Sequence, residues 1–196
     1  MRRPLVLLNL LLVLLILGLA FYWQPETAPA PRVVEPVGGD FTLSGPQGEQ
    51  SLHDFSGKLV LLSFGYTFCP DICPTTLVIW GQALSQLAAE ELRKVQPIFV
   101  SVDPERDTPA RLAEYTAFFH PSIIGLTGRP ERLRGVAARY GAAFARQENA
   151  SAGGYVVDHT ALTYLIDGQG RLVERLPHAT PPDHLLAALR KHLPSH

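Results

Sequence analysis

The sequence predicts a mixed α/β domain, a sheet layered by helices, and three observations carry that prediction. Short apolar runs typical of buried strands alternate with segments whose apolar residues recur every three or four positions, as on one face of a helix. The chain then ends with a strand-like hairpin and a closing helix. Both cysteines lie in the turn between the first buried strand and the helix after it. Strands that alternate with helices are typical of a sheet covered by helices.

The first 23 residues differ from the rest of the chain. Arg2 and Arg3 precede an apolar run from Leu5 to Trp23. At about 1.5 Å per residue, this run is long enough to cross a bilayer core of ~30 Å. We therefore expect a single transmembrane helix over residues 1–23. The arginines would lie in the cytoplasm and the domain on the periplasmic side of the inner membrane. A cleaved signal peptide, with residues 18–20 as its cleavage site, is the alternative.

Residues 24–37 are rich in proline and alanine and show no apolar period. We expect a semi-extended spacer there, between the membrane and a folded domain over residues 38–196. The formal net charge of the chain is −1 and its basic residues are scattered, which argues against a nucleic-acid partner.

The domain is expected to begin with a hairpin, in which residues 40–43 and 50–52 flank a turn at residues 45–48. Residues 58–64 then form a nearly continuous apolar run, as in a strand buried on both faces. The helix after the cysteines carries its apolar residues on one face. These residues are Leu77, Trp80, Leu84, Leu87, Ala88 and Leu92.

The remaining elements continue the alternation. Thr108 and Pro109 mark a helix start, because a threonine cap followed by a proline at the first position is favoured there. Pro130 opens another helix, which Gly141 ends. The other expected strands are residues 95–102, 123–126, 155–157, 161–166 and 171–176, and residues 182–193 form the closing helix. A reactive cysteine pair between the first buried strand and a helix indicates a thioredoxin-like fold, here with an extra N-terminal β-hairpin.

Cys69 and Cys73 are the two cysteines of the chain. Pro74 fits the first helical position, so we expect the helix to begin at Cys73, with Cys69 in the turn before it. Both sulfurs then lie near the positive end of the helix dipole, which favours the thiolate. A thiolate is both a nucleophile and a metal ligand, so this placement suits redox chemistry and metal binding equally.

Three roles for the thiols remain open at this point. A structural disulfide would close a tiny loop and contribute little stability. Thiol–disulfide exchange is the second role, although oxidoreductases of this fold space their cysteines two residues apart and carry a proline before a late strand, where residues 157–161 have none. The third is a metal site formed by Cys69, Cys73 and His159. Two thiolates and an imidazole suit copper in either oxidation state, and zinc is possible.

Two aspartates and the remaining histidines are further candidates. Asp103 and Asp107 either cap the helix at Thr108 or touch the metal, and both options stay open. The other histidines are interpreted as solvated, structural or terminal residues. They are His53, His120, His178, His184, His192 and His196.

Three ordered motifs resemble the Sco/SenC family. They are Tyr-Thr-Phe-Cys-Pro-Asp-Ile-Cys-Pro at residues 66–74, Ser-Val-Asp-Pro-Glu-Arg-Asp-Thr-Pro at 101–109 and Asp-His-Thr at 158–160. The members of this family are membrane-anchored, thioredoxin-fold copper-binding proteins that help to assemble the copper centre of cytochrome c oxidase. The resemblance implies that Cys69 and Cys73 are thiolate ligands, and His159 the imidazole ligand, of a copper ion, Cu(I) or Cu(II).

The resemblance also implies a metallochaperone rather than an enzyme. The reduced thiols and the imidazole would hold copper until a partner with a more complete ligand set takes it. The expected partners are the copper-bearing subunit of cytochrome c oxidase, a copper donor and a thiol reductant. Alternatively, Cys69 and Cys73 form a redox-active disulfide, and their thiols keep the partner's copper site reduced. A thiol–disulfide oxidoreductase or redox sensor on the same scaffold is the competing function.

Overall fold

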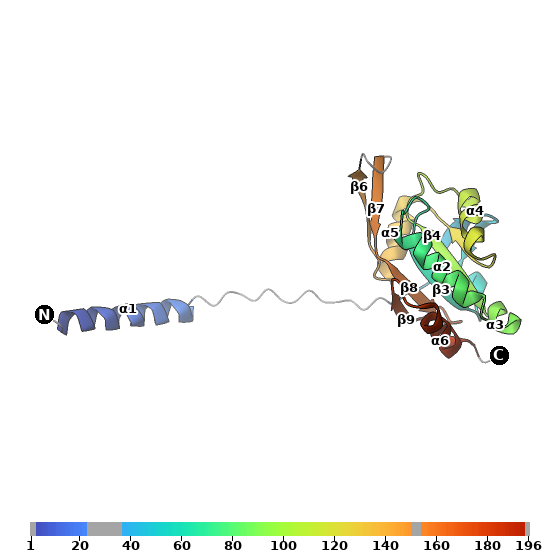
Figure 1. The fold of residues 1–196 in the computed structure, drawn as a ribbon. Coiled ribbons are helices and arrows are strands. Elements are labelled where there is room, and N and C mark those ends of the chain that lie inside the picture. Colours follow the sequence, from blue (N-terminus) through green and yellow to red (C-terminus); the bar gives the residue numbers. More distant parts are fainter. Residues whose placement is uncertain (1–2, 23–36, 150–153, 195–196) are drawn as a thin grey trace. The chain divides into compact units, whose positions relative to one another are not determined.

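A computed structural model of the chain describes residues 3–22, 37–149 and 154–194 (Figure 1). The chain divides into two compact units, Met1–Val34 and Glu35–His196, and each is described by itself. The spacer expected over residues 24–37 lies outside the described residues except for Val37.

In the first unit, the segment expected to cross a membrane contains one helix, α1 (Arg3–Tyr22). Among the residues that the structure describes, no helix is long and apolar enough to span a bilayer. The membrane span therefore stays a prediction.

The second unit is built on a five-stranded sheet in the order β5–β4–β3–β8–β9. Its strands are β3 (Leu59–Gly65), β4 (Val95–Ser101), β5 (Ile124–Leu126), β8 (Leu162–Ile166) and β9 (Leu172–Pro177). β3, β4 and β5 run parallel, whereas β8 is antiparallel to β3 and β9 is antiparallel to β8. The central strand β3 is buried along its whole length, as its apolar sequence predicts.

Helices cover both faces of this sheet. They are α2 (Ile72–Leu84), α3 (Ala89–Arg93), α4 (Pro109–Phe119), α5 (Pro130–Arg139) and α6 (Pro182–His192), with a short 3-10 helix over Leu52–Phe55. Phe64 and Gly65 are neighbours in β3, so their side-chain positions point to opposite faces. Phe64 packs against Tyr140 at the end of α5, whereas Gly65 faces Cys73 of α2. Hence α2, which contacts α4 and α6, covers one face, and α5 covers the other.

Two hairpins lie outside the five-stranded sheet. The expected N-terminal hairpin is present as β1 (Thr42–Gly45) and β2 (Gly48–Ser51). The second hairpin pairs β6 (Phe144–Asn149) with β7 (Gly154–His159), and Figure 1 shows it extending beyond the sheet. β7 contains the predicted strand at residues 155–157, but β6 was not predicted. Its Phe-Ala-Arg-Gln-Glu-Asn sequence is mostly polar and lacks the apolar alternation by which a strand is recognised.

The helix after the cysteines differs from the prediction at both ends. It begins at Ile72, one residue before Cys73, and Pro74 lies in the first turn, where the N–H groups have no partner inside the helix. It ends at Leu84 instead of continuing to Leu92, and α3 follows as a separate short helix. Leu87, in the connection, is buried, and Leu92 packs against the same core. One apolar pattern therefore spans two helices because both face one core.

Thr163→Val is expected to lower the free energy of unfolding by about 1–3 kcal/mol. Oγ1 of Thr163, in β8, accepts a hydrogen bond of 3.1 Å from Nε1 of Trp80, and both side chains are buried. Valine has nearly the same shape but no acceptor, so the indole N–H would lose its partner in the core. Urea denaturation of the full chain measures the change.

Tyr164→Phe is the matched control. The hydroxyl of Tyr164 is buried and has no hydrogen-bond partner within the described part of the chain, so its removal is expected to leave stability unchanged or to raise it. If Thr163→Val proves as stable as this control, the Trp80–Thr163 bond does not stabilise the core.

Candidate metal centre

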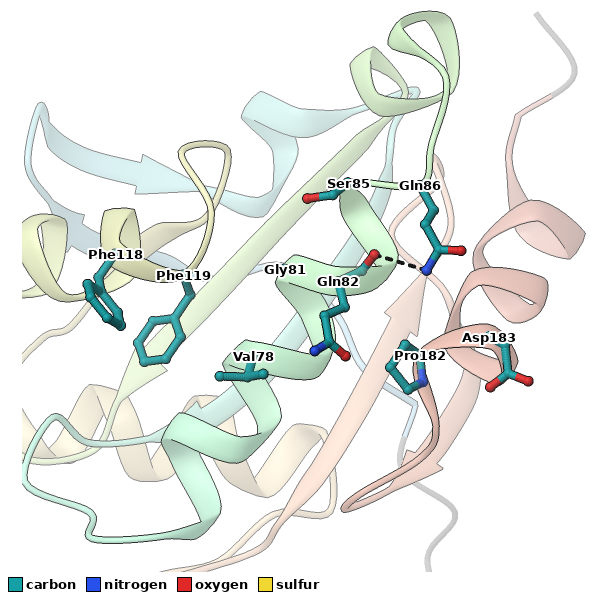
Figure 2. Close-up of a pocket in the computed structure, with 9 residues that line it drawn as sticks. All are labelled: Val78, Gly81, Gln82, Ser85, Gln86, Phe118, Phe119, Pro182 and Asp183. Carbon is teal, nitrogen blue, oxygen red and sulfur yellow. Dashed lines mark hydrogen bonds between the residues drawn. The ribbon is translucent and has the colours of Figure 1, made fainter.

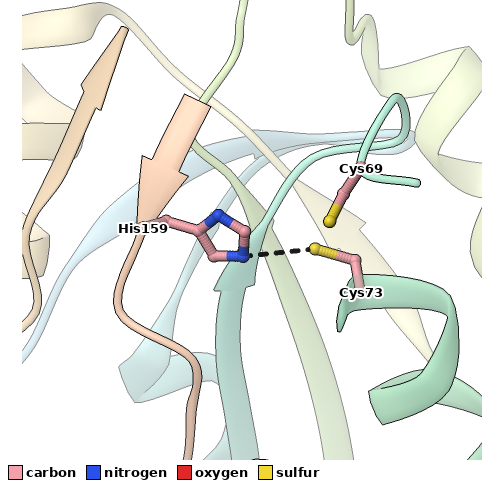
Figure 3. A group of neighbouring side chains, drawn as sticks. All are labelled: Cys69, Cys73 and His159. Carbon is pink, nitrogen blue, oxygen red and sulfur yellow. Dashed lines mark hydrogen bonds between the residues drawn. The ribbon is translucent and has the colours of Figure 1, made fainter. Parts of the chain in front are cut away.

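Three side chains from distant parts of the sequence meet at the end of β3 (Figure 3). Cys69 lies in the loop after β3, Cys73 in the first turn of α2, and His159 at the end of β7. One ligand atom of each residue lies within 4.8 Å of the other two, and Sγ of Cys73 is 3.3 Å from Nε2 of His159. Both cysteines are free thiols. The structure therefore brings together all three residues that the sequence singles out.

The orientation of the imidazole is set by its second nitrogen. Nδ1 of His159 lies 2.9 Å from the carbonyl oxygen of Val157. A carbonyl only accepts hydrogen bonds, so Nδ1 is the donor and Nε2 faces the sulfurs. Metal-binding histidines usually have their other nitrogen held in this way. The ring of Tyr66 packs edge-to-face on the imidazole, with the ring centroids 5.6 Å apart, and limits its rotation.

The two thiols are not equivalent. The hydrogen bond that Cys73 donates to the Cys69 sulfur is the main cause that lowers the pKa of Cys69 to about 5, with help from the backbone N–H groups of Cys73 and Asp71. The same bond, together with burial, raises the pKa of Cys73 well above the usual range. At neutral pH the pair therefore holds one thiolate, at Cys69, and one proton, on Cys73. The Cys69 thiolate is available as a nucleophile and as a ligand for a soft cation.

Gly65, the last residue of β3, makes room for the buried sulfur. A Cβ atom at this position would lie 2.5 Å from Sγ of Cys73 and 2.7 Å from the ring of Phe99. Any side chain at position 65 would therefore displace the Cys73 thiol from its place beside His159. This glycine directly precedes the cysteine motif at residues 66–74, but the requirement for it follows only from the packing of α2 on β3.

Asp107 holds the loop before Cys69. Its carboxylate is fully buried and accepts hydrogen bonds from the Thr67 N–H at 2.9 Å, from Thr67 Oγ1 at 2.5 Å and from Ser101 Oγ at 2.6 Å. The cap of α4 is Thr108, whose Oγ1 accepts from the N–H of Arg111, and no carboxylate belongs to the group of potential ligands among the described residues. Both options considered for Asp107 are therefore wrong: it fastens the cysteine loop to β4.

Asp103 also neither caps α4 nor joins the ligand group. Its Oδ1 accepts a hydrogen bond of 2.7 Å from the hydroxyl of Tyr155 in β7, and its Oδ2 accepts one of 2.5 Å from Nε of Arg106. Burial is the main cause that raises the pKa of Tyr155 to about 12, and the bond to Asp103 adds to it, so this hydroxyl stays a donor. Asp103, Arg106 and Tyr155 thus connect the loop after β4 to the strand that carries His159.

The other histidines with described contacts lie elsewhere. Ring nitrogens of His53, His120, His178 and His192 contact Ser56, Ser122, Thr76 and Glu174 respectively. None of them belongs to the cysteine–histidine group, and His196 lies outside the described residues. Their interpretation as structural or surface residues therefore agrees with the contacts of the described ones.

A large open hollow lies away from Cys69, Cys73 and His159. It has a volume of about 760 Å³ between α2, the end of α4 and the start of α6, and its lining includes Val78, Phe118 and Pro182 (Figure 2). None of Cys69, Cys73 and His159 lines it. This hollow is therefore separate from the cysteine–histidine group.

The donor set itself fits copper. Two cysteine sulfurs and an imidazole nitrogen are soft to borderline ligands, and copper accepts them in both oxidation states. A structural zinc site usually has four protein ligands, whereas the group found among the described residues has three. A three-ligand set leaves a coordination position for a donor atom of another molecule.

The chain is similar to known proteins over most of its length. It matches the model of the SCO1/SenC family over residues 29–194. It is 39% identical over 172 residues to the protein SCO2 homolog, mitochondrial, of Bos taurus. The aligned residues make up 87% of this chain and 65% of that protein. The structure of apo Sco1 from Thermus thermophilus is 43% identical, with a TM-score of 0.74 over 83% of this chain and 95% of that one. ScoI of Bradyrhizobium japonicum, solved with copper bound, is 38% identical, with a TM-score of 0.73 over 80% and 99% of the two chains.

Alkylation of the reduced full chain is expected to modify Cys69 first. Because the thiolate is the reactive form, the rate at Cys69 should rise with pH through about 5 and then stay constant, while Cys73 stays protonated and reacts slowly. Cys73→Ala removes the main cause of the lowered pKa, so the rise should shift towards the ordinary cysteine value of about 8.5. Mass spectrometry of peptides alkylated over a pH series measures both rates. Equal rates at the two cysteines would contradict the assignment.

Gly65→Ala is expected to destabilise the domain and to displace the Cys73 thiol, since the added methyl group would meet Sγ of Cys73 and the ring of Phe99. We expect a loss of about 1–3 kcal/mol in the free energy of unfolding, as for overpacked cores. Gly135→Ala is the control, because the space around Gly135 in α5 is open and alanine favours a helix by roughly 1 kcal/mol. Denaturation measures both variants, and equal stability of the two would refute the tight packing.

Proposed function

Since the chain belongs to the SCO1/SenC family, we propose that it binds one copper ion through Cys69, Cys73 and His159 and delivers it to the copper-bearing subunit of cytochrome c oxidase during assembly. The observation that carries this proposal is the convergence of two free thiols and an oriented imidazole nitrogen within 4.8 Å. The copper-bound ScoI structure, at 38% identity, supports the choice of metal.

The residues have distinct tasks in this proposal. Cys69 supplies a thiolate at neutral pH, because its pKa is lowered to about 5. Cys73 releases its proton as it binds the copper, since only the thiolate is a strong ligand. Nε2 of His159 completes the set while its Nδ1–H stays bound to Val157. The copper is cargo, and a partner with more or better ligands takes it by exchanging one bond at a time.

Keeping the partner's copper site reduced is the second role, and the inequality of the two thiols favours it. The Cys69 thiolate would attack a disulfide in that site to form a mixed disulfide, and the Cys73 thiolate, after losing its proton, would attack Cys69 Sγ to release the partner as a dithiol. The chain is left with a Cys69–Cys73 disulfide, which a thiol reductant must reduce before copper binds again. In either role the domain acts with its partner and needs no small-molecule substrate.

We also keep the expected location as part of the proposal. Residues 1–23 would anchor the chain as a single pass in the inner membrane, residues 24–37 would act as the spacer, and residues 38–196 would form the copper-binding domain on the periplasmic side. A copper donor in the same compartment would load the site. The apolar sequence of α1 and the positive-inside rule support this orientation.

The reduced full chain is expected to bind one copper ion per molecule. His159→Ala should weaken the affinity severely, by at least 10–100-fold, the loss that is typical even for groups that only support a ligand. The Cys69→Ser/Cys73→Ser double variant should abolish binding. Competition with a copper chelator of known affinity, combined with metal analysis, measures both values.

His178→Ala is the control, because His178 contacts Thr76 and lies outside the ligand group. This variant should bind copper as tightly as the unmodified chain. A chain that takes up no copper, yet reduces protein disulfides equally well with and without His159, would instead be a thiol–disulfide oxidoreductase.

A further inference from the structure

The strand that carries His159 is not part of the five-stranded sheet. β7 pairs with β6 only, in a separate two-stranded sheet of the described residues. Cys73, in contrast, is held by α2 against Gly65 of the central strand. The position of His159 relative to the two sulfurs is therefore set by the connection to β8, which begins three residues later, and by the contacts of β7 with the rest of the domain.

Tyr155 makes most of these contacts. Tyr155, Val157 and His159 alternate along β7, so they face the same side, and Tyr155 and Val157 are buried. The Tyr155 hydroxyl donates to Oδ1 of Asp103 at 2.7 Å, and its carbonyl accepts from Nη1 of Arg106 at 3.1 Å. Its ring lies between the guanidinium groups of Arg106 and Arg146, each 3.7 Å from the ring centroid. The strand is thus attached to the domain four residues before the imidazole.

Asp103, which accepts the hydrogen bond from Tyr155, is itself held in place by neighbouring residues. Asp103 is buried, its N–H donates to Oγ of Ser101 at 3.1 Å, and its Oδ2 accepts from Nε of Arg106. Oγ of Ser101 in turn donates to Asp107, which holds the cysteine loop through Thr67. The segment 101–107 therefore fastens both sides of the centre: the cysteine loop through Asp107, and the histidine strand through Asp103 and Arg106.

We propose that Tyr155 is a positioning residue for His159, whose hydroxyl bond to Asp103 keeps the imidazole within reach of a metal ion held by the two sulfurs. This inference rests on the proposed copper-binding function. Loss of the bond removes one attachment of β7 to the segment 101–107, leaving those to Arg106, and lets the nitrogen ligand move out of reach, while Cys69 and Cys73 keep their places on α2 and its loop. Tyr155 itself does not touch the metal.

The test is Tyr155→Phe in the full chain, which removes the hydroxyl and leaves the ring between the two arginines. Copper affinity should fall about 10-fold or more, as for other groups that orient a ligand. The nitrogen coupling in the electron paramagnetic resonance spectrum of the Cu(II)-loaded protein should weaken towards that of His159→Ala. Before any metal is added, hydrogen exchange at the Val157 amide should accelerate, because its bond to Tyr66 Oη depends on the same docking.

Tyr140→Phe is the matched control. It also removes one hydroxyl from a buried ring, here the donor of a 2.8 Å bond to the carbonyl of Gly39, and none of its ring contacts involves the three ligands. It should leave the affinity, the nitrogen coupling and the Val157 exchange unchanged. Asp103→Asn keeps an acceptor for the Tyr155 hydroxyl and should retain the nitrogen coupling, whereas Asp103→Ala should lose it.

The outcomes separate this inference from the function on which it rests. If the unmodified chain binds copper without nitrogen coupling, or binds none, the proposed ligand set fails. If it shows the coupling and Tyr155→Phe retains both coupling and affinity, only the role of Tyr155 is overturned. In the His159→Ala background, Tyr155→Phe should lower the affinity no further. A further tenfold loss there would mean that Tyr155 acts on the thiols or the whole fold, and would also overturn the inference.

Discussion

The burial of one carboxylate, that of Asp107, is the constraint on which the rest of the centre depends. A buried charge is costly unless hydrogen bonds replace the lost water, and Asp107 receives three, from Thr67 N–H, Thr67 Oγ1 and Ser101 Oγ. Satisfying it forces the loop before Cys69 to lie against the end of β4. Since β4 also leads into Asp103, the same segment orders the strand that carries His159. The hydrogen bonds that satisfy the buried Asp107 carboxylate therefore hold distant parts of the chain together.

The two sides of the centre are held differently: Cys73 lies on a rigid part of the domain, whereas His159 lies on a hairpin attached to it. Cys73 sits on α2 against the central strand, in a space that only a glycine at position 65 leaves open. His159 sits on a hairpin whose two strands pair with each other and not with the central sheet, to which it is joined by the connection to β8 and by side-chain contacts. Backbone ladders are cooperative, whereas a few side-chain bonds can be exchanged one by one. This division suits the proposed function, in which the site holds a copper ion and then releases it to a partner.

The sequence predicted most elements of the fold because they depend on local patterns, and it predicted the grouping of Cys69, Cys73 and His159 through the motifs that resemble the Sco/SenC family. The apolar run of β3, the cysteine pair before α2 and the cap and proline at Thr108 and Pro109 are all readable within a few residues. Strand β6 was missed because its sequence is mostly polar and shows no apolar alternation, and it pairs only with β7 among the described strands. The roles of Gly65, Asp107 and Tyr155 were also not predicted, since each acts on a residue far along the chain or across the sheet. Asp103 and Asp107 could not be assigned from their motif because one partner of each, Tyr155 and Thr67 respectively, lies outside it.

The unequal burial of the two sulfurs has a consequence for chemical damage. Cys69 is 9% exposed and Cys73 is 2% exposed, so a peroxide meets the outer thiolate first and converts it to a sulfenic acid. The protonated thiol of Cys73, close behind it, can condense with that sulfenic acid to a disulfide with loss of water. The disulfide is reversible, whereas further oxygen transfer to a sulfinic acid is not. The inner cysteine thereby protects the outer one from permanent oxidation whenever the two thiols are free of metal.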